Sequence, residues 1–274
     1  MASTFIRLTG ADALEVLHRV TTQHLRDLAP GQCAMTLACD FRGRLLHRFA
    51  VVNTTTGILL LRDDAAADSL VEYIDRQIFR ERVTIADESG EWNVALRVDD
   101  GGLEVGAFRM TAGSLHVALR PEPRFTLHVA NSATPLVASQ EVERIRAGIP
   151  RHGDEISEDF NPFEVGLQTD VHLNKGCFTG QEALLRMMTY GGVRRRLVLL
   201  WGAGAPPESR STVRAAGESV GAITHAVAND AAWAGLGVMK REAAAIAAEV
   251  ETDSGMARCS TFPEVRPAGL PEPT

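Results

Sequence analysis

Cysteine is scarce in this sequence, and its few residues follow no pattern typical of a metal site or a disulfide scaffold. The four are Cys33, Cys39, Cys177 and Cys259. No two of them form a Cys-x-x-C pair, and no cysteine and histidine residues have the spacing of a zinc finger. So few cysteines in 274 residues are typical of reducing surroundings, so we expect no metal ligands and no stable iron–sulfur cluster of the chain's own.

Long apolar runs and an excess of basic residues are also missing. No run approaches the roughly 20 residues of a membrane span, and the formal net charge of −7 argues against nonspecific binding of nucleic acid. Folded-looking sequence begins by Phe5, which leaves no room for a leader segment. We therefore expect a cytoplasmic monomer that binds neither nucleic acid nor membranes.

Lysine is rare as well, because arginine supplies almost all of the basic residues and only Lys175 and Lys240 remain. Lys175 begins the stretch Lys-Gly-Cys-Phe-Thr-Gly-Gln-Glu, which ends at Glu182. Within it, Thr179 and Glu182 stand three residues apart just before an apolar run, the spacing of a capping box. The spacing predicts a helix capped by Thr179, of about three turns, that ends at Gly191-Gly192.

Cys177 would precede this helix and face its unpaired amides. Those amides, the helix dipole and the nearby cation of Lys175 favour a thiolate. Gly176 and Gly180 allow the backbone to turn tightly or to approach a ligand. The alternative interpretation is a buried, inert cysteine before an ordinary helix, since cysteine is among the most buried residues.

The first part of the chain has the pattern of an α+β fold rather than of parallel βαβ units. Short apolar strands recur from Phe5 onward, with one helix ending near Val20 and another beginning at Asp63-Asp64. A helix follows from about Ser139 to Ala147. The long segment 151–174 is polar but includes an apolar run, which favours a functional loop over disorder.

The pattern changes near Arg196. From there, short apolar runs with glycine between them predict a small antiparallel barrel. The length of the chain also favours two domains, so we expect an α+β region at 1–195 and a β-barrel at 196–274. We expect the tail from Pro267 to be frayed.

Three motifs in order resemble the YgfZ family, folate-binding proteins associated with iron–sulfur clusters and related to the T-protein of glycine cleavage, an aminomethyltransferase. The motifs are Arg-Ile-Arg-Ala-Gly-Ile-Pro at 144–150, Asn-Pro-Phe-Glu-Val-Gly-Leu at 161–167 and Lys-Gly-Cys-Phe-Thr-Gly-Gln-Glu at 175–182. The resemblance implies two interleaved α+β lobes with antiparallel sheets, the inner one at roughly 46–130. With the C-terminal barrel, these lobes surround a central opening for tetrahydrofolate.

The sequence departs from the family pattern at three places. The family's Thr-x-Asp near the end of the first helix is absent, because Thr21 is followed by Thr22 and Gln23. Phe178 replaces the tyrosine of the motif. His47 and Arg48 match the positions where true aminomethyltransferases place an aspartate, and those enzymes generally lack the motif cysteine. The missing aspartate at His47 and Arg48 and the presence of Cys177 both count against glycine-cleavage chemistry.

These patterns predict the site residues. Glu164 is expected to bind a pterin, because one carboxylate can accept two neighbouring N–H donors. Arg186 could meet the anionic folate tail, although an exposed arginine is the alternative. The predicted catalytic residues are Cys177 and Lys175, and the predicted folate-binding residues are Glu164, Gly176, Phe178, Gly180, Gln181 and Arg186. We expect His152 and His172 to be polar loop residues.

Two functions remain open from the sequence. The first is a tetrahydrofolate-binding protein that uses Cys177 in the assembly or repair of iron–sulfur clusters, with client or assembly proteins as partners. The second is a tetrahydrofolate-dependent aminomethyltransferase or other one-carbon transferase. A cysteine at 177 favours the first, and an acidic residue at His47 or Arg48 would favour the second.

Overall fold

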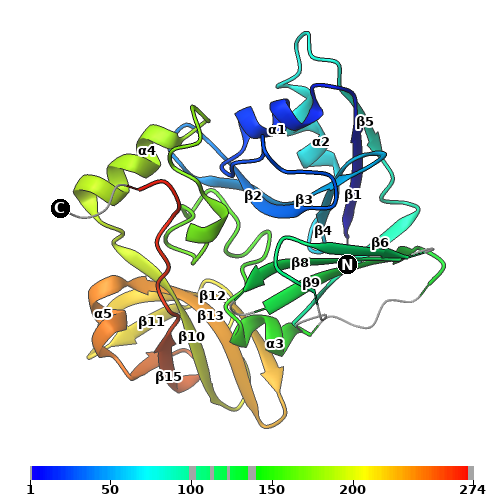
Figure 1. Ribbon diagram of the computed structural model, residues 1–274. Helices are drawn as coiled ribbons and strands as arrows, with labels where there is room; N and C mark the ends of the chain where they lie inside the picture. Colours follow the sequence, from blue (N-terminus) through cyan, green and yellow to red (C-terminus); the bar gives the residue numbers. More distant parts are fainter. Residues whose placement is uncertain (1, 99–102, 112–113, 122–123, 135–139, 271–274) are drawn as a thin grey trace.

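A computed structural model describes residues 2–98, 103–111, 114–121, 124–134 and 140–270. The fold contains two antiparallel sheets and a closed barrel, with helices and a long loop between them (Figure 1). The fold is therefore mixed α+β with a six-stranded C-terminal barrel, which confirms the predicted fold class.

The first sheet has the order β2-β3-β4-β1-β5, and an apolar cluster packs against each of its two faces. Its strands are β1 (Thr4–Thr9), β2 (Cys33–Cys39), β3 (Leu45–Thr54), β4 (Gly57–Arg62) and β5 (Thr84–Asp87). Alternate side chains of β3 point to opposite faces of the first sheet, because the side chains of a strand alternate with a period of two residues. Phe49 packs beneath α1 (Ala13–Val20) and α2 (Asp68–Asp75), whereas Ala50 faces the second sheet.

The second sheet has the order β6-β9-β8-β7 and packs on the first through apolar side chains such as Val117 and Leu127. Its strands are β6 (Trp92–Arg97), β7 (Phe108–Thr111), β8 (Ser114–Pro121) and β9 (Arg124–Asn131). A short helix, α3 (Glu141–Arg146), then leads into the long loop. This loop contains one 3₁₀ turn, η1 (Gln168–Asp170), and packs its apolar run against β2, β3 and the barrel.

The barrel closes in the order β10-β13-β12-β11-β14-β15 around the fully buried Trp233. Its elements are β10 (Arg195–Ala203), β11 (Thr212–Ala215), β12 (Glu218–Asn229), β13 (Ala232–Lys240), α5 (Arg241–Ile246), β14 (Glu249–Thr252) and β15 (Gly255–Thr261). The register of β12 shifts between Ile223 and His225. Such a bulge redirects side chains, and here Thr224 bonds the long loop at Glu155.

The predicted cap of the helix after Cys177 is wrong. The helix is α4 (Gln181–Arg186), and its N-cap is Gly180 in the left-handed conformation, with no side-chain cap. Glu182 instead pairs with Arg186 at 2.7 Å on the solvent side. The predicted extent is confirmed, because a π-helical turn, η2 (Met187–Gly191), continues α4 to Gly192.

Contact with a distant turn explains why a glycine begins α4. A Cβ atom on Gly180 would lie 2.5 Å from the carbonyl oxygen of Asp40 and close to Gly43. Only glycine allows this approach at a φ of 86°. The start of α4 is therefore set by the turn after β2, which the local sequence does not reveal.

The expectation of a frayed tail is wrong for residues 267–270. Pro267 is buried, and Ala268 forms a β-bridge with His172, where the Leu173 N–H donates to the Ala268 oxygen at 2.8 Å. Figure 1 shows this last segment crossing from the barrel to the region of α4. The tail thus holds the chain just before Lys175.

The two glycines that flank Cys177 give a matched stability test. Both have positive φ, 105° at Gly176 and 86° at Gly180, so an alanine at either position carries roughly 1–2 kcal/mol of backbone strain. A Cβ atom on Gly176 would meet no other atom within 4 Å, whereas one on Gly180 would meet backbone. We expect urea unfolding to show Gly180→Ala less stable than Gly176→Ala by about 1–3 kcal/mol, the cost of overpacking. Equal losses would contradict the Asp40 contact.

Candidate functional site

The stretch from Lys175 to Gln181 is anchored on both sides of Cys177. On one side, Phe178 is buried in the core that the long loop shares with β2 and the barrel. The Gln181 side-chain amide donates to the Leu173 oxygen at 2.9 Å. On the other side, Lys175 is itself buried. Cys177 therefore sits on a short exposed loop between two fixed points.

The ammonium of Lys175 points into the protein. Its Nζ donates to the backbone oxygen of His18 at the end of α1 and lies 5.1 Å from the centre of the Phe178 ring. Burial, with a smaller effect of the charge on Arg26, lowers the pKa of Lys175 to about 8. The contacts of Lys175 are thus with α1 and the core.

Cys177 carries the exposed thiol among the four cysteines, all of which lie in the described chain. Burial raises the pKa of Cys33 to about 12 and that of Cys259 to about 11, and it raises the pKa of Cys39 as well. The three buried thiols are therefore held in the unreactive protonated form. The alternative of a buried, inert Cys177 is wrong.

Glu164 is buried and its carboxylate is already occupied. Arg195 binds it with two bonds, Nε to Oε1 at 2.7 Å and Nη2 to Oε2 at 3.0 Å. The Asn161 N–H donates to Oε2 at 3.0 Å, and Arg44 adds a longer contact of 3.4 Å. This fork is the geometry in which a carboxylate would also hold a pterin, so Arg195 stands where such a ligand would bind.

A groove of about 700 Å³ lies beside this cluster. It is lined by Leu45, Leu46, His47, Ser69, Glu72, Tyr73, Arg76, Gln77, Ser157, Glu158 and Asp159. The backbone oxygen of Asp159 accepts from both Arg44 and Arg195, at 3.1 and 2.9 Å. The Glu164 cluster therefore adjoins the end of the groove at which Asp159 lies.

Of the two positions predicted to lack a carboxylate, Arg48 has one as its partner in the fold, and His47 lies beside Arg62. Arg48 pairs with Asp170 at 2.8 Å, and both side chains are at most 5% exposed. Burial, together with the charge on Arg62, lowers the pKa of His47 to about 3, so this imidazole is neutral. Its Nδ1 lies 3.2 Å from Nη1 of Arg62, consistent with accepting a hydrogen bond.

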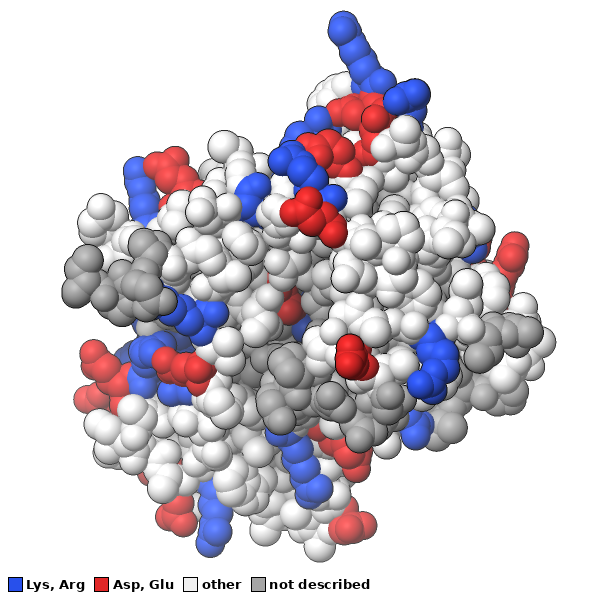
Figure 2. Space-filling model, viewed as in Figure 1, with Lys and Arg blue, Asp and Glu red and all other residues white. Residues whose placement is uncertain are grey.

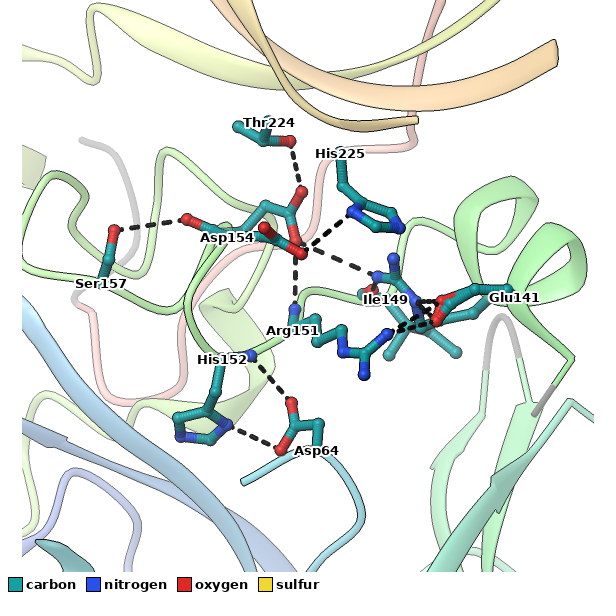
Figure 3. Close-up of polar contacts among 11 residues, drawn as sticks. Asp64, Glu141, Ile149, Arg151, His152, Asp154, Ser157, Thr224 and His225 are labelled. Atoms are coloured by element: carbon teal, nitrogen blue, oxygen red, sulfur yellow. Dashed lines mark hydrogen bonds and ion pairs between the residues drawn. The ribbon is translucent and has the colours of Figure 1, made fainter. Parts of the chain in front are cut away.

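An Asp–His pair, Asp64 and His152, lies beside Arg48. No sequence pattern indicates this pair. Asp63-Asp64 do not begin the predicted helix, because α2 begins at Asp68. Asp64 binds Nδ1 of His152 at 2.8 Å and also accepts from the His152 N–H (Figure 3). The Arg48 N–H donates to Nε2 of His152 at 3.2 Å, which places the imidazole proton on Nδ1. No local pattern joins residues 64 and 152.

A second polar cluster ties the long loop to α3 and the barrel. Figure 3 shows Arg151 pointing to Glu141, at 2.9 Å, and Thr224 and His225 pointing to the loop from the barrel. Asp154 lies 3.3 Å from His225, and the fully buried Glu155 bonds Thr224. Burial raises the pKa of Glu155. The sequence marked these residues only as a polar loop.

Figure 2 shows acidic and basic side chains intermixed on one face, with charged atoms visible in a central hollow.

Of the predicted site residues, Arg186 lies exposed in its pair with Glu182, and Gly176 is exposed beside Cys177. Within the described residues, no three acidic, histidine or cysteine side chains are arranged to hold a metal ion. None of the described helices has the length and hydropathy needed to cross a membrane.

The architecture matches a solved structure, the glycine cleavage system aminomethyltransferase T from Bartonella henselae. The TM-score is 0.75 over 96% of this chain and 83% of that one, at 15% sequence identity. The chain has the aminomethyltransferase fold.

Sequence comparison shows homology to aminomethyltransferase-like proteins. A chloroplastic protein of Arabidopsis thaliana, named as a transferase, is 29% identical over 88% of this chain and 64% of its own length, so the match spans less than two thirds of that relative. The aminomethyltransferase of Rubrobacter xylanophilus is 25% identical over 80% of this chain and 68% of its own. No protein-family model matches.

The burial of Lys175 predicts how it titrates. Its pKa of about 8 lies below its ordinary 10.5, so between these values the unfolded chain binds more protons at this residue. This group alone therefore makes the free energy of unfolding rise with pH across that window. Because the chain has two lysines, ¹³C-lysine NMR resolves both, and Lys240→Arg assigns them. A midpoint near 10.5 for Lys175 would contradict its buried position.

Proposed function

We propose that this protein is a YgfZ-like, tetrahydrofolate-binding protein that takes part in the assembly or repair of iron–sulfur clusters. The observation that carries the proposal is the exposed thiol of Cys177 on a loop whose two flanks are anchored. Such a thiol is available to a partner protein, whereas the three buried thiols are not. The proposal includes action as a cytoplasmic monomer on iron–sulfur client or assembly proteins.

The groove beside Glu164 supports the folate part of the proposal. Its volume of about 700 Å³ lies within the range of small-molecule sites, and Ser69, Gln77 and Ser157 offer polar groups along it. The Glu164 carboxylate would accept from a pterin edge in place of the Arg195 fork, and the Arg195 side chain is 38% exposed. A bound tetrahydrofolate supplies a carrier for one-carbon groups.

Cys177 would supply one thiolate to a cluster in transit. Iron–sulfur clusters are held mainly by cysteine thiolates, commonly four, and the other three cysteines of this chain are buried. The remaining ligands must then come from a partner, so the cluster is cargo shared between two proteins. This sharing explains how one exposed cysteine can serve without cluster spacing in the sequence.

The second candidate is a one-carbon transferase of the aminomethyltransferase type. The observation that favours it is the Asp170 carboxylate that pairs with Arg48, together with the Asp64 carboxylate bound to His152, whose Nε2 accepts from the Arg48 N–H. We rank it second because Asp170 is neutralised by Arg48 and Asp64 is bound to His152. Formation of methylene-tetrahydrofolate from an aminomethylated carrier protein tests it, and robust turnover would reverse this ranking.

Cys177 should react first with iodoacetamide near neutral pH, because the other three thiols are buried and protonated. Timed alkylation with mass spectrometry measures the four rates. Cys177→Ser is nearly isosteric and should keep the fold, yet it should abolish rescue of iron–sulfur enzyme activity in cells that lack the protein. Full rescue by Cys177→Ser would overturn the proposed role of this thiol.

Glu164→Gln should weaken tetrahydrofolate binding, because one acceptor oxygen becomes a donor that faces the pterin. Loss of a charge-assisted bond costs about 1.5–3 kcal/mol, or roughly ten- to hundredfold in Kd. Calorimetric titration with tetrahydrofolate and its formyl and methylene forms measures the effect. Glu182→Gln, which changes an exposed carboxylate paired only with Arg186, is the control and should bind normally. An unchanged Kd in Glu164→Gln would remove Glu164 from the site.

A further inference from the structure

His18 and Lys175 form two hydrogen bonds, each between the side chain of one residue and the backbone oxygen of the other. Nε2 of His18 lies 3.1 Å from the backbone oxygen of Lys175, and the Lys175 ammonium donates to the backbone oxygen of His18. Both residues are at most 5% exposed. This pair, which we call the clasp, joins the end of α1 to the loop of Cys177 across 157 residues of sequence.

The surroundings of His18 define which nitrogen carries the proton. The N–H groups of Leu25 and Arg26 donate to its Nδ1, at 3.2 and 3.1 Å. Nδ1 is therefore an acceptor, and the proton is on Nε2, which donates to the Lys175 oxygen. Burial and the neighbouring charge of Lys175 lower the pKa of His18, which keeps this neutral tautomer. Each ring nitrogen thus has a separate task.

The centre of the loop between the anchors, Gly176 and Cys177, is exposed. Gly176 has positive φ and nothing within 4 Å of a Cβ position. Phe178 anchors the C-terminal side of Cys177, and the clasp anchors the N-terminal side. Because glycine allows wide backbone freedom, release of the clasp would move the N-terminal anchor of Cys177 back to Leu173, whose N–H donates to the Ala268 oxygen.

We propose that His18 is the positioning residue for Cys177. By holding the backbone oxygen of Lys175 through Nε2, it fixes the place at which the thiol meets solvent. The role of the thiol rests on the proposed function, whereas the positioning itself is a property of the fold.

Two substitutions separate the tasks of the two nitrogens. In His18→Asn the side-chain oxygen replaces Nδ1 and the donor to Lys175 is lost. In His18→Gln the amide nitrogen replaces Nε2, and the acceptor for Leu25 and Arg26 is lost. Because Cys177 is the exposed thiol, a nitroxide label can be attached to it selectively in the full-length chain.

We expect the label spectrum of His18→Asn to show a mobile nitroxide, with the melting temperature close to that of the unsubstituted protein. His18→Gln should show the restricted spectrum of the unsubstituted protein with a lower melting temperature. A purely structural role would lower stability in both variants without changing label mobility in His18→Asn, and this outcome would overturn the proposal. If His18→Asn does not fold, His18→Asp is labelled instead, because its carboxylate keeps an acceptor for Leu25 and Arg26 and offers no donor to the Lys175 oxygen. An unchanged spectrum there would overturn the proposal equally.

Rescue of iron–sulfur enzymes in cells tests the link to function. We expect His18→Asn to lose rescue and His18→Gln to keep it. If label mobility changes as expected while both variants rescue fully, the positioning role of His18 stands and the proposed function of Cys177 is overturned. The spectroscopic test of the positioning role and the cellular test of the proposed function can therefore fail independently.

Discussion

Pairing of the charges buried along the loop at 151–170 is the constraint on which the three sheets depend. A buried charge without a partner costs several kcal/mol, so each such group must find its counterpart as the chain folds. Asp170 binds Arg48 of the first sheet, Glu155 bonds Thr224 of the barrel, and Glu164 binds Arg195 at the first barrel strand. A single loop thereby fixes the first sheet relative to the barrel.

The same loop positions the residues of the candidate site. The same segment carries Asp159, which lines the groove, and Glu164 beside it, and it continues directly into the stretch with Cys177. The C-terminal tail strengthens this link, because Ala268 bridges His172 just before Lys175. The groove and the thiol are thus held by one continuous piece of chain, so a change that loosens the loop would disturb both.

Glu164 and Cys177 nonetheless represent different chemical tasks. Glu164 is enclosed and held by arginines, as a carboxylate that recognises a fork of donors requires. Cys177 is exposed and meets solvent on a loop without side-chain cover at Gly176. This division matches a protein that holds a small molecule inside and offers a thiol outside.

The sequence by itself determined the fold class, the helical continuation after Cys177 and the residue types of the site, because strand alternation, helix periodicity and short motifs are local properties. Only the tertiary structure decided that Gly180, not Thr179, begins α4, since that choice depends on Asp40, which is far away in the sequence. It alone brought Asp64 to His152 and His18 to Lys175. These pairings follow from strand register and burial, which place residues together whatever their separation in sequence.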